Sequence, residues 1–307
     1  MPERLIDLRS DTVTRPSAAM LAAMGSAELG DDGQEGDPTT RRLQERAAEL
    51  MGKEAALFVP SGTMANLLAM VCQTAPGDEI VLERGAHVYN FEFNGLGAVA
   101  GLVAVPLDGE RGHLTADGVS ALLAADVPRG PGPKLLWLEN TANLAGGTVQ
   151  NRAQMAAVAQ VAHDASLRVH LDGARVLNAA TALGSSPADL CADVDTVAFC
   201  LSKGLGCPVG SLLCGSAELI ERAWSRRRQL GGSLRQSGIL AAAGLVALDT
   251  RLERLADDHA NARWLAERLA ELPGILLDPA QVETNIVWFA CTDRHWPQRC
   301  REAGVLI

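Results

Sequence analysis

The sequence is poor in aromatic residues and in positive charge. Five Phe, five Trp and one Tyr make up 4% of its 307 residues. It carries 37 acidic against 27 basic residues, a formal net charge of -10. An overall negative field repels polyanions, so a general nucleic-acid-binding protein is disfavoured and no nucleic acid partner is expected. Any anionic ligand must therefore be bound by local features of the fold.

Paired cysteines and long apolar runs are also lacking. The seven cysteines show no C-x2-C spacing and stand at 72, 191, 200, 207, 214, 291 and 300. This usage favours a reduced cytoplasmic protein over a disulfide scaffold or a zinc site, and we expect no metal. The beginning MPERLIDLRSD has charges where a signal peptide needs an apolar stretch, and no run approaches 18 uninterrupted apolar residues. Secretion and membrane association are therefore disfavoured.

What is present is an alternation of strand-like and helical segments. At 32.3 kDa, with 48% hydrophobic and 21% charged residues, the chain is long and apolar enough for two folded domains. The pattern predicts an α/β fold with a mostly parallel sheet flanked by helices. We expect an N-terminal arm at 1–30, a large α/β domain at 31–235 and a smaller C-terminal α+β domain at 236–307. The last contains long helices ending near Leu272 and a strand-like run at 284–289.

Residues that typically begin or end helices support these elements. Asp37 and Pro38 supply a cap and a first-turn residue for a helix over 39–51, and Gly52 ends it. Strands are predicted at 55–60, 79–83, 102–106, 134–139, 168–172, 194–202 and 211–214. In an open parallel sheet, ligands bind beyond the carboxyl ends of the strands, so we expect the functional residues just after each strand.

The first such segment is FVPSGTMAN, in which an apolar run breaks at Pro60 and enters a helix. Gly62 permits close backbone approach, and the Thr63 hydroxyl with the first-turn amides can bind a phosphate. Ser-Gly-Thr before a helix is more often an ordinary helix cap, so the pattern alone is weak.

The second segment, RVHLDGAR, places Asp172 at a strand end and Arg175 three residues later. The two could form a structural ion pair with each other. Alternatively, Asp172 could face a protonated ring nitrogen, leaving Arg175 for a carboxylate or a phenolic oxygen.

Two further segments offer a reactive amine and an imidazole. Lys203 follows an apolar strand and is surrounded by small residues. A lysine at the end of a buried strand loses hydration, which favours the neutral amine that forms Schiff bases, although most lysines are solvated surface residues. His87 follows the run EIVLERGA. It could stack on a flat ring or move a proton, or be a loop histidine with ordinary partners.

Together these features match pyridoxal 5′-phosphate, which has a phosphate, an aldehyde and a basic pyridine nitrogen. Gly62 and Thr63 suit the phosphate, Lys203 the aldehyde, Asp172 the pyridinium and His87 the ring face. The order of phosphate loop, stacking residue, Asp and Lys along the chain resembles that of the fold-type I pyridoxal-phosphate-dependent, transferase-like enzymes.

Longer strings extend the resemblance. The sequence is similar to the L-threonine aldolase family, of the low-specificity type, in DLRSDTVTRP, GDDGQEGDPTTRRLQE, PSGTMAN, LENT, HLDGAR, SKGLGCPVGS, RRRQLGG and LRQSG. These strings span nearly the whole chain. DLRSDT and the combination of HLDGAR with SKGLG are typical of that family rather than of pyridoxal enzymes in general.

The resemblance implies roles for individual residues. Lys203 matches the Schiff-base lysine, Asp172 the pyridinium partner, Gly62 and Thr63 the phosphate ligands, and His87 the stacking histidine. Arg175 and Ser10 match residues that hold the substrate carboxylate, Arg175 lying also beside the cofactor. Arg228 and Gly232, in RRRQLGG, match a stretch that reaches the phosphate of a neighbouring subunit, which implies a homodimer or homotetramer with shared sites.

The sequence also departs from the family pattern. The family string ENTHN reads Glu139-Asn140-Thr141-Ala142-Asn143 here, so a histidine near the site is replaced by Ala142. The family also places a further carboxylate-binding arginine beyond AGVLI at 303–307, so the small domain is expected to be incomplete.

The implied reaction is pyridoxal-phosphate-dependent retro-aldol cleavage of L-threonine or L-allo-threonine, and of other β-hydroxy-α-amino acids, to glycine and an aldehyde such as acetaldehyde. The implied enzyme is an aldehyde-lyase of threonine catabolism and glycine biosynthesis. His87 is the best candidate for the base that takes the β-hydroxyl proton, and a water held by Glu92 is the alternative. Another β-eliminating lyase, an amino-acid racemase or a degenerate pyridoxal-phosphate-binding protein remain competing hypotheses.

Overall fold

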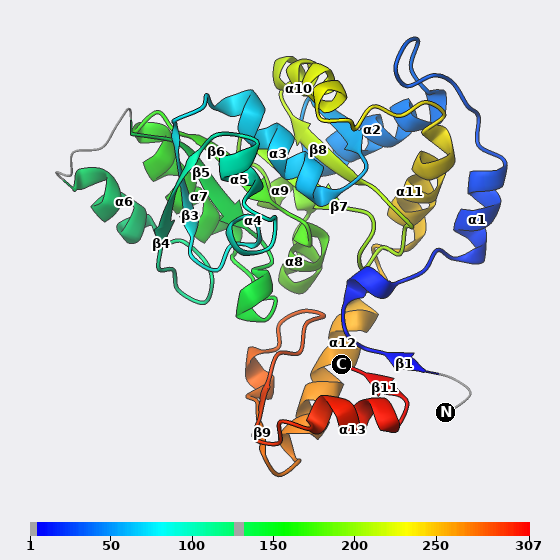
Figure 1. Ribbon diagram of the computed structural model, residues 1–307, viewed down its shortest axis with the longest axis vertical. Coiled ribbons are helices and arrows are strands. Elements are labelled where there is room, and N and C mark those ends of the chain that lie inside the picture. Colours follow the sequence, from blue (N-terminus) through cyan, green and yellow to red (C-terminus); the bar gives the residue numbers. More distant parts are fainter. Residues whose placement is uncertain (1–4, 126–131) are drawn as a thin grey trace.

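The structure is a computed structural model that describes residues 5–125 and 132–307. Within these ranges the main sheet has seven strands (Figure 1), in the order β2 (Ala55–Val59), β8 (Ser211–Gly215), β7 (Thr196–Cys200), β6 (Arg168–Asp172), β5 (Pro133–Glu139), β3 (Glu79–Glu83) and β4 (Val103–Leu107). Strand β8 runs antiparallel to both of its neighbours, and the other neighbouring pairs are parallel. The predicted α/β architecture with a mostly parallel sheet is confirmed.

Local sequence explains where the elements begin and end. Helix α2 (Pro38–Met51) starts at Asp37, whose side chain accepts a hydrogen bond from the Thr40 N–H at 2.9 Å. It ends at Gly52, which adopts the left-handed conformation with φ of 63°, a conformation that glycine reaches without a steric penalty. The predicted cap, first-turn proline and terminating glycine are confirmed.

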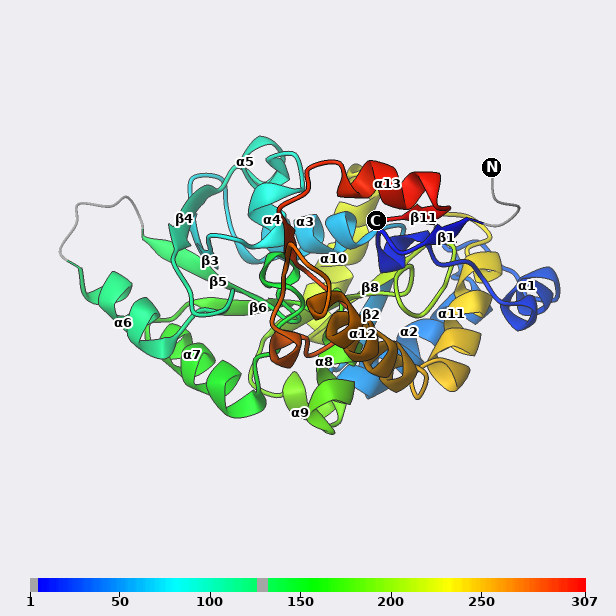
Figure 2. The same ribbon diagram turned by 90° about the horizontal axis from the view of Figure 1, so that it is seen from below.

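Helices cover both faces of the sheet (Figure 2), because the strands alternate their side chains between two apolar layers. In β2, Ala56 and Phe58 belong to one layer, and Leu57 and Val59 to the other. The first layer includes α1 (Ala18–Gly25), α2, α6 (Ala116–Ala124), α7 (Arg152–Asp164), α8 (Val176–Leu183), α9 (Pro187–Leu190) and α11 (Gly238–Thr250). The second includes α3 (Gly62–Gln73), α4 (His87–Asn90), α5 (Gly95–Ala98) and α10 (Ala217–Gln229).

A smaller C-terminal part lies beyond the carboxyl side of this sheet (Figure 1). It contains α12 (Leu255–Ala270), α13 (Trp296–Glu302) and the antiparallel pair β9 (Ile275–Leu276) and β10 (Ala290–Cys291). The N-terminal arm joins it, because β1 (Ile6–Asp7) pairs in parallel with β11 (Val305–Leu306). Single 3-10 turns are η1 (Asp11–Val13), η2 (Asn143–Ala145) and η3 (Pro279–Gln281).

The predicted strand at 284–289 is wrong, since regular strand structure begins only at Ala290. This segment makes side-chain contacts instead of a backbone ladder: the Thr284 hydroxyl donates to the Gly147 carbonyl at 2.7 Å. Val287 packs in an apolar cluster with Ala262, Ala266 and Val282. The apolar pattern reflects side-chain packing, which periodicity alone does not distinguish from strand pairing.

The domain boundary at 236 stays a proposal. Helix α11, which follows it, packs against α1 of the predicted N-terminal arm and against α2 of the large domain. A boundary between α11 and α12 therefore agrees better with the packing.

Across the described residues, every helix is too short or too polar to cross a lipid bilayer. All seven cysteines are free thiols, and four of them are buried: Cys191, Cys200, Cys207 and Cys214.

Candidate active site

A cavity of about 360 Å³ lies where the parallel strands end. Predicted site residues on its wall are Gly62, Thr63, His87, Asp172 and Lys203. They follow four different strands, β2, β3, β6 and β7, whose carboxyl ends share one edge of the sheet. The parallel topology therefore brings together residues that are up to 141 positions apart between Gly62 and Lys203 (203 − 62).

The N-terminus of α3 forms one end of the cavity. Ser61 caps the helix by accepting the Met64 N–H at 3.2 Å, so the ordinary capping role is present. The amides of Gly62 and Thr63 lie in the first turn, where they have no intrahelical partner and can receive an anion. A Cβ at Gly62 would lie 2.9 Å from the Cys200 sulfur, so only glycine fits here.

Asp172 ends β6 and is 3% exposed. Its Oδ1 accepts the Ala174 N–H at 3.1 Å, and its Oδ2 accepts an amide N–H of Asn66 at 2.9 Å. Among the described residues, no cationic side chain forms an ion pair with it. The expected alternative, an Asp172–Arg175 pair, does not form. A buried carboxylate without a cationic partner is a good match for a ligand that carries a positive charge.

His87 and Glu92 form a polar pair beside Asp172. The His87 Nδ1 lies 3.0 Å from Glu92 Oε1, and the Asn66 amide donates to the same oxygen at 2.8 Å. The bond to Glu92 raises the pKa of His87 above its ordinary value and outweighs the opposing effect of burial. The side chain of His87 is 34% exposed and that of Glu92 only 2%, so His87 is the member that can exchange protons with a ligand or water.

One nitrogen of His87 and one carboxylate oxygen each of Glu92 and Asp172 lie within 4.8 Å of one another, a spacing that metal ligands also show. The Asn66 amide nitrogen bridges the two carboxylates, so the position between them holds N–H donors. Because these donors occupy the space between the two acids, the arrangement favours an organic ligand next to them rather than an ion between them.

Glu139, at the end of β5, supports the loops around this pair. Its two carboxylate oxygens accept the backbone N–H of His87 at 2.6 Å and that of Asn143 at 2.8 Å. Burial, together with the nearby carboxylate of Asp172, raises the pKa of Glu139 to about 7. Glu139 therefore holds the start of α4 and the turn η2 at the end of its own strand, β5, which pairs with β6.

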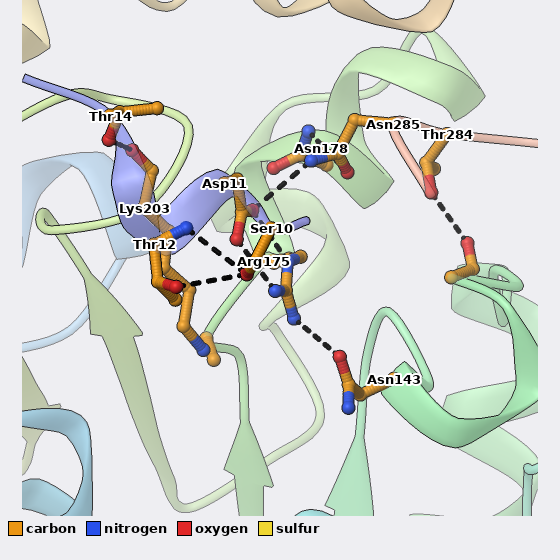
Figure 3. A network of polar contacts seen from close by, with 12 residues as sticks. Ser10, Asp11, Thr12, Thr14, Asn143, Arg175, Asn178, Lys203, Thr284 and Asn285 are labelled. Atoms are coloured by element: carbon orange, nitrogen blue, oxygen red, sulfur yellow. Dashed lines mark hydrogen bonds and ion pairs between the residues drawn. The ribbon is translucent and has the colours of Figure 1, made fainter. Parts of the chain in front are cut away.

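Lys203 lies in the loop after β7 and is partly buried. The Thr14 hydroxyl donates to its backbone carbonyl at 2.7 Å, which ties the loop to the N-terminal arm (Figure 3). Lys203 lines the same cavity as Asp172 and His87 and is partly buried, so it is not the solvated surface lysine of the alternative interpretation.

Arg175 lies outside the wall of this cavity, and its side chain points to Asp11 of the N-terminal arm (Figure 3). It bonds side-on to Asp11, through Nε at 2.7 Å and Nη2 at 2.8 Å, and its Nη1 donates to Asn143 Oδ1 at 3.0 Å. Burial alone would raise the pKa of Asp11, but the Arg175 guanidinium outweighs it and keeps that pKa below its ordinary value. Ser10, next in the arm, is exposed and its hydroxyl bonds to Thr12.

Arg228 and Gly232 lie outside the cavity wall of this chain. Arg228 is exposed near the end of α10. Gly232 is buried, and a Cβ there would overlap the sulfur of Met64 in the first turns of α3. Their contact with the phosphate of a neighbouring subunit stays a prediction.

Asn66, Asp11 and Asn143 contribute to the site but were not predicted. Asn66 follows Gly62 by one helical turn, so its orientation toward the same cavity was readable from the spacing. Asp11 and Asn143 gave no such indication, because their partner Arg175 is remote in sequence. Ala142, where the family has a histidine, is buried beside Gly112, so no proton donor stands there.

These residues fit pyridoxal phosphate on their own chemistry. A free helix N-terminus with an obligatory glycine suits the phosphate, and the unpaired Asp172 suits a pyridinium. Lys203 supplies an amine for the aldehyde in the same cavity. The cavity of about 360 Å³ is of the size that holds a small cofactor.

Comparison with known proteins gives a consistent result. The family model described as beta-eliminating lyase matches residues 7–292. A low specificity L-threonine aldolase of Escherichia coli O157:H7 is 45% identical over 285 residues, which are 92% of this chain and 84% of that protein. Low-specificity L-threonine aldolase 1 of Arabidopsis thaliana is 43% identical over 299 residues, covering 95% of this chain and 83% of the relative.

Solved structures agree on the fold. A candidate L-allo-threonine aldolase of Listeria monocytogenes EGD-E superposes with a TM-score of 0.82 at 21% identity, covering 98% of this chain and 85% of that one. The threonine aldolase of Leishmania major gives a TM-score of 0.75 at 20% identity, covering 88% and 80%. At such identities the likeness establishes the architecture alone.

Proposed function

The chain belongs to the beta-eliminating lyase family and, within it, to the L-threonine aldolases, and from this membership we propose that its cavity cleaves L-threonine or L-allo-threonine. The products are glycine and acetaldehyde, and other β-hydroxy-α-amino acids give glycine and the corresponding aldehyde. The observation that carries the proposal is the convergence of Lys203, Asp172, His87 and the α3 N-terminus on one cavity.

Pyridoxal phosphate, when bound, supplies an aldehyde that holds the substrate amine and a conjugated ring that accepts the electrons of the breaking Cα–Cβ bond. Lys203 would provide the amine to which this aldehyde attaches. Asp172 keeps the ring nitrogen protonated, since a buried carboxylate favours a cation beside it. Gly62 and Thr63 hold the phosphate through their amides and the Thr63 hydroxyl.

His87 takes the proton from the β-hydroxyl group as the carbonyl of the aldehyde forms. It is exposed enough to reach the ligand, and its Nδ1 is oriented by Glu92 at 3.0 Å. That bond fixes the ring, so the other nitrogen, Nε2, is the atom that accepts the proton. Because protonated His87 cannot act as a base, the reaction requires a pH above its raised pKa.

The carboxylate of the substrate is held by Arg175, with Ser10 as a weaker contributor. Fixing this carboxylate and the amine leaves one orientation for the Cα–Cβ bond, which is how positioning lowers the barrier.

A second copy of the chain completes the phosphate site in this proposal. Among the described residues that line the cavity, Lys203 is the only lysine or arginine. Because Lys203 is assigned to the aldehyde, no second cation is left for the phosphate, and phosphate sites usually use a cation in addition to amides. Arg228 and Gly232 of a neighbouring subunit in a homodimer or homotetramer would supply this contact. Mixing inactive Lys203→Ala and Arg228→Ala chains tests the shared site, because a mixed dimer contains one intact site and should regain activity.

The seven free thiols support a reducing, cytoplasmic location for such an enzyme. Threonine breakdown and glycine supply are the corresponding metabolic roles.

The decisive experiment incubates the purified chain and pyridoxal phosphate with L-threonine, L-allo-threonine, L-serine and L-alanine in separate assays. We expect equal amounts of acetaldehyde and glycine from the two threonine isomers. Pyruvate from serine without aldehyde from threonine would instead identify an eliminating lyase, and racemised alanine a racemase. An unchanged cofactor spectrum with every amino acid would identify a degenerate binding protein.

A further inference from the structure

The ion pair between Asp11 and Arg175 is buried and joins distant parts of the chain (Figure 3). Both side chains are 8% exposed, and the two residues are 164 positions apart. The pairing is side-on, with Nε and Nη2 of Arg175 at 2.7 and 2.8 Å from the two Asp11 oxygens. A buried bidentate pair of this kind restricts the guanidinium to one plane and one direction.

The pairing with Asp11 leaves some N–H donors of the Arg175 guanidinium free. A guanidinium has five N–H donors. Two donate to Asp11 and a third, on Nη1, donates to Asn143 Oδ1 at 3.0 Å. One N–H on Nη1 and one on Nη2 therefore remain, which is the number that a carboxylate accepts in a bidentate contact.

Asp11 is itself held from the C-terminal part of the molecule. The Asn285 amide donates to Asp11 Oδ2 at 3.1 Å, and the Asn178 amide donates to Asn285 Oδ1 at 3.3 Å. Asn143, on the other side of Arg175, is fixed by its backbone N–H bond to Glu139. The guanidinium thus has supports from the arm, from the segment after η3 and from the large domain.

We propose that Asp11 is a positioning residue for the substrate: it holds Arg175 side-on so that the two remaining N–H donors face the substrate carboxylate. This inference rests on the proposed function, since it takes an amino acid as the ligand. Asp11 does not touch the substrate in this scheme and acts through Arg175.

The test compares glycine with glycinamide, which has the same amine but no carboxylate. Dissociation constants are measured by calorimetric titration of the chain loaded with pyridoxal phosphate, for the wild type, Asp11→Asn and Asp11→Ala. We expect both variants to bind glycine at least tenfold more weakly and glycinamide with little change. The KM for L-threonine should rise more than kcat falls.

Asp7→Asn is the matched control. Asp7 lies on the same arm and pairs with Arg9, but the pair is exposed, so this variant should keep the wild-type constants for both ligands. Asn285→Ala leaves the Asp11–Arg175 pair in place but removes the bond that orients Asp11, together with the bond from Asn178. It should weaken glycine binding about threefold and covers the case in which the Asp11 variants do not fold.

Other results overturn the proposal. Equal weakening of glycine and glycinamide would show that Asp11 only stabilises the fold. Tighter glycine binding would show that Asp11 competes with the substrate for Arg175. Failure of the proposed function is recognised separately, because the wild-type chain would then neither bind glycine nor cleave threonine.

Discussion

The two parts of the proposed site are built differently. The cofactor end, comprising Gly62, Thr63, His87, Asp172 and Lys203, lies at the carboxyl ends of strands of one sheet and in the segments that follow them. The other part, here called the carboxylate end, comprises Asp11, Asn143, Arg175 and Asn285, which lie outside the wall of the cavity. It joins the N-terminal arm, the large domain and the segment after η3.

This difference separates chemistry from positioning. Residues of the cofactor end have few mutual ion pairs and leave Asp172 for a ligand, so they are prepared for chemistry at some cost to stability. Residues of the carboxylate end satisfy one another through a buried ion pair and amide bonds. We therefore expect substitutions at the cofactor end to affect turnover, and those at the carboxylate end to affect stability and substrate affinity.

The largest effect is expected for Lys203→Ala. Loss of the nucleophilic amine should lower turnover at least about a thousandfold and remove the near-visible absorbance of the anchored cofactor. The unfolding temperature should change little. Lys134→Ala, which alters an exposed lysine at the start of β5, is the control. Retained absorbance and turnover in Lys203→Ala would remove the assignment of this residue.

Asp172→Asn should lower turnover about a hundredfold while the cofactor still binds. The amide keeps the shape of the side chain but cannot stabilise a protonated ring nitrogen. The exposed Asp189→Asn serves as the control. Measured rates near those of the wild type would count against the pyridinium role.

At the carboxylate end, Asp11→Ala should lower the free energy of unfolding by about 3 kcal/mol, since it leaves the buried Arg175 unpaired. Chemical denaturation measures this directly. Asp7→Asn, which breaks an exposed pair, should cost less than about 1 kcal/mol. Equal losses for the two variants would contradict the contrast between buried and exposed pairs.

The smallest effect is a shift in pH dependence for Glu92→Gln. The carboxylate of Glu92 raises the pKa of His87, so its loss lowers that pKa. His87 must be neutral to act as the base, and the acidic limb of the kcat profile should therefore move to lower pH. An unmoved limb would place the base elsewhere, and His87→Phe would then retain activity.

Much of the cofactor end could be predicted from the sequence. Each of its residues stands at the end of a strand whose apolar run is clear or in the segment that follows, as with Asp172 at the end of RVHLD. Asp37, Pro38 and Gly52, residues typical of helix ends, correctly predicted where α2 begins and ends. The strand predicted at 284–289 was wrong because the segment makes side-chain contacts, such as that of Val287 with an apolar cluster, without a backbone ladder to a neighbouring strand, and both kinds of packing give similar patterns.

By itself, the sequence determined the alternating α/β architecture, the edge of the sheet that carries the site and the residue types that meet there. These depend on local periodicity, on turn chemistry and on the shared direction of parallel strands. Only the tertiary structure decided the partners of Arg175 and the bridging position of Asn66 between Glu92 and Asp172. The Asn285–Asp11 bond, for example, spans 274 positions. A hydrogen bond depends on a few tenths of an ångström between two side chains, and such distances follow from the packing of whole domains rather than from the spacing of residues along the chain.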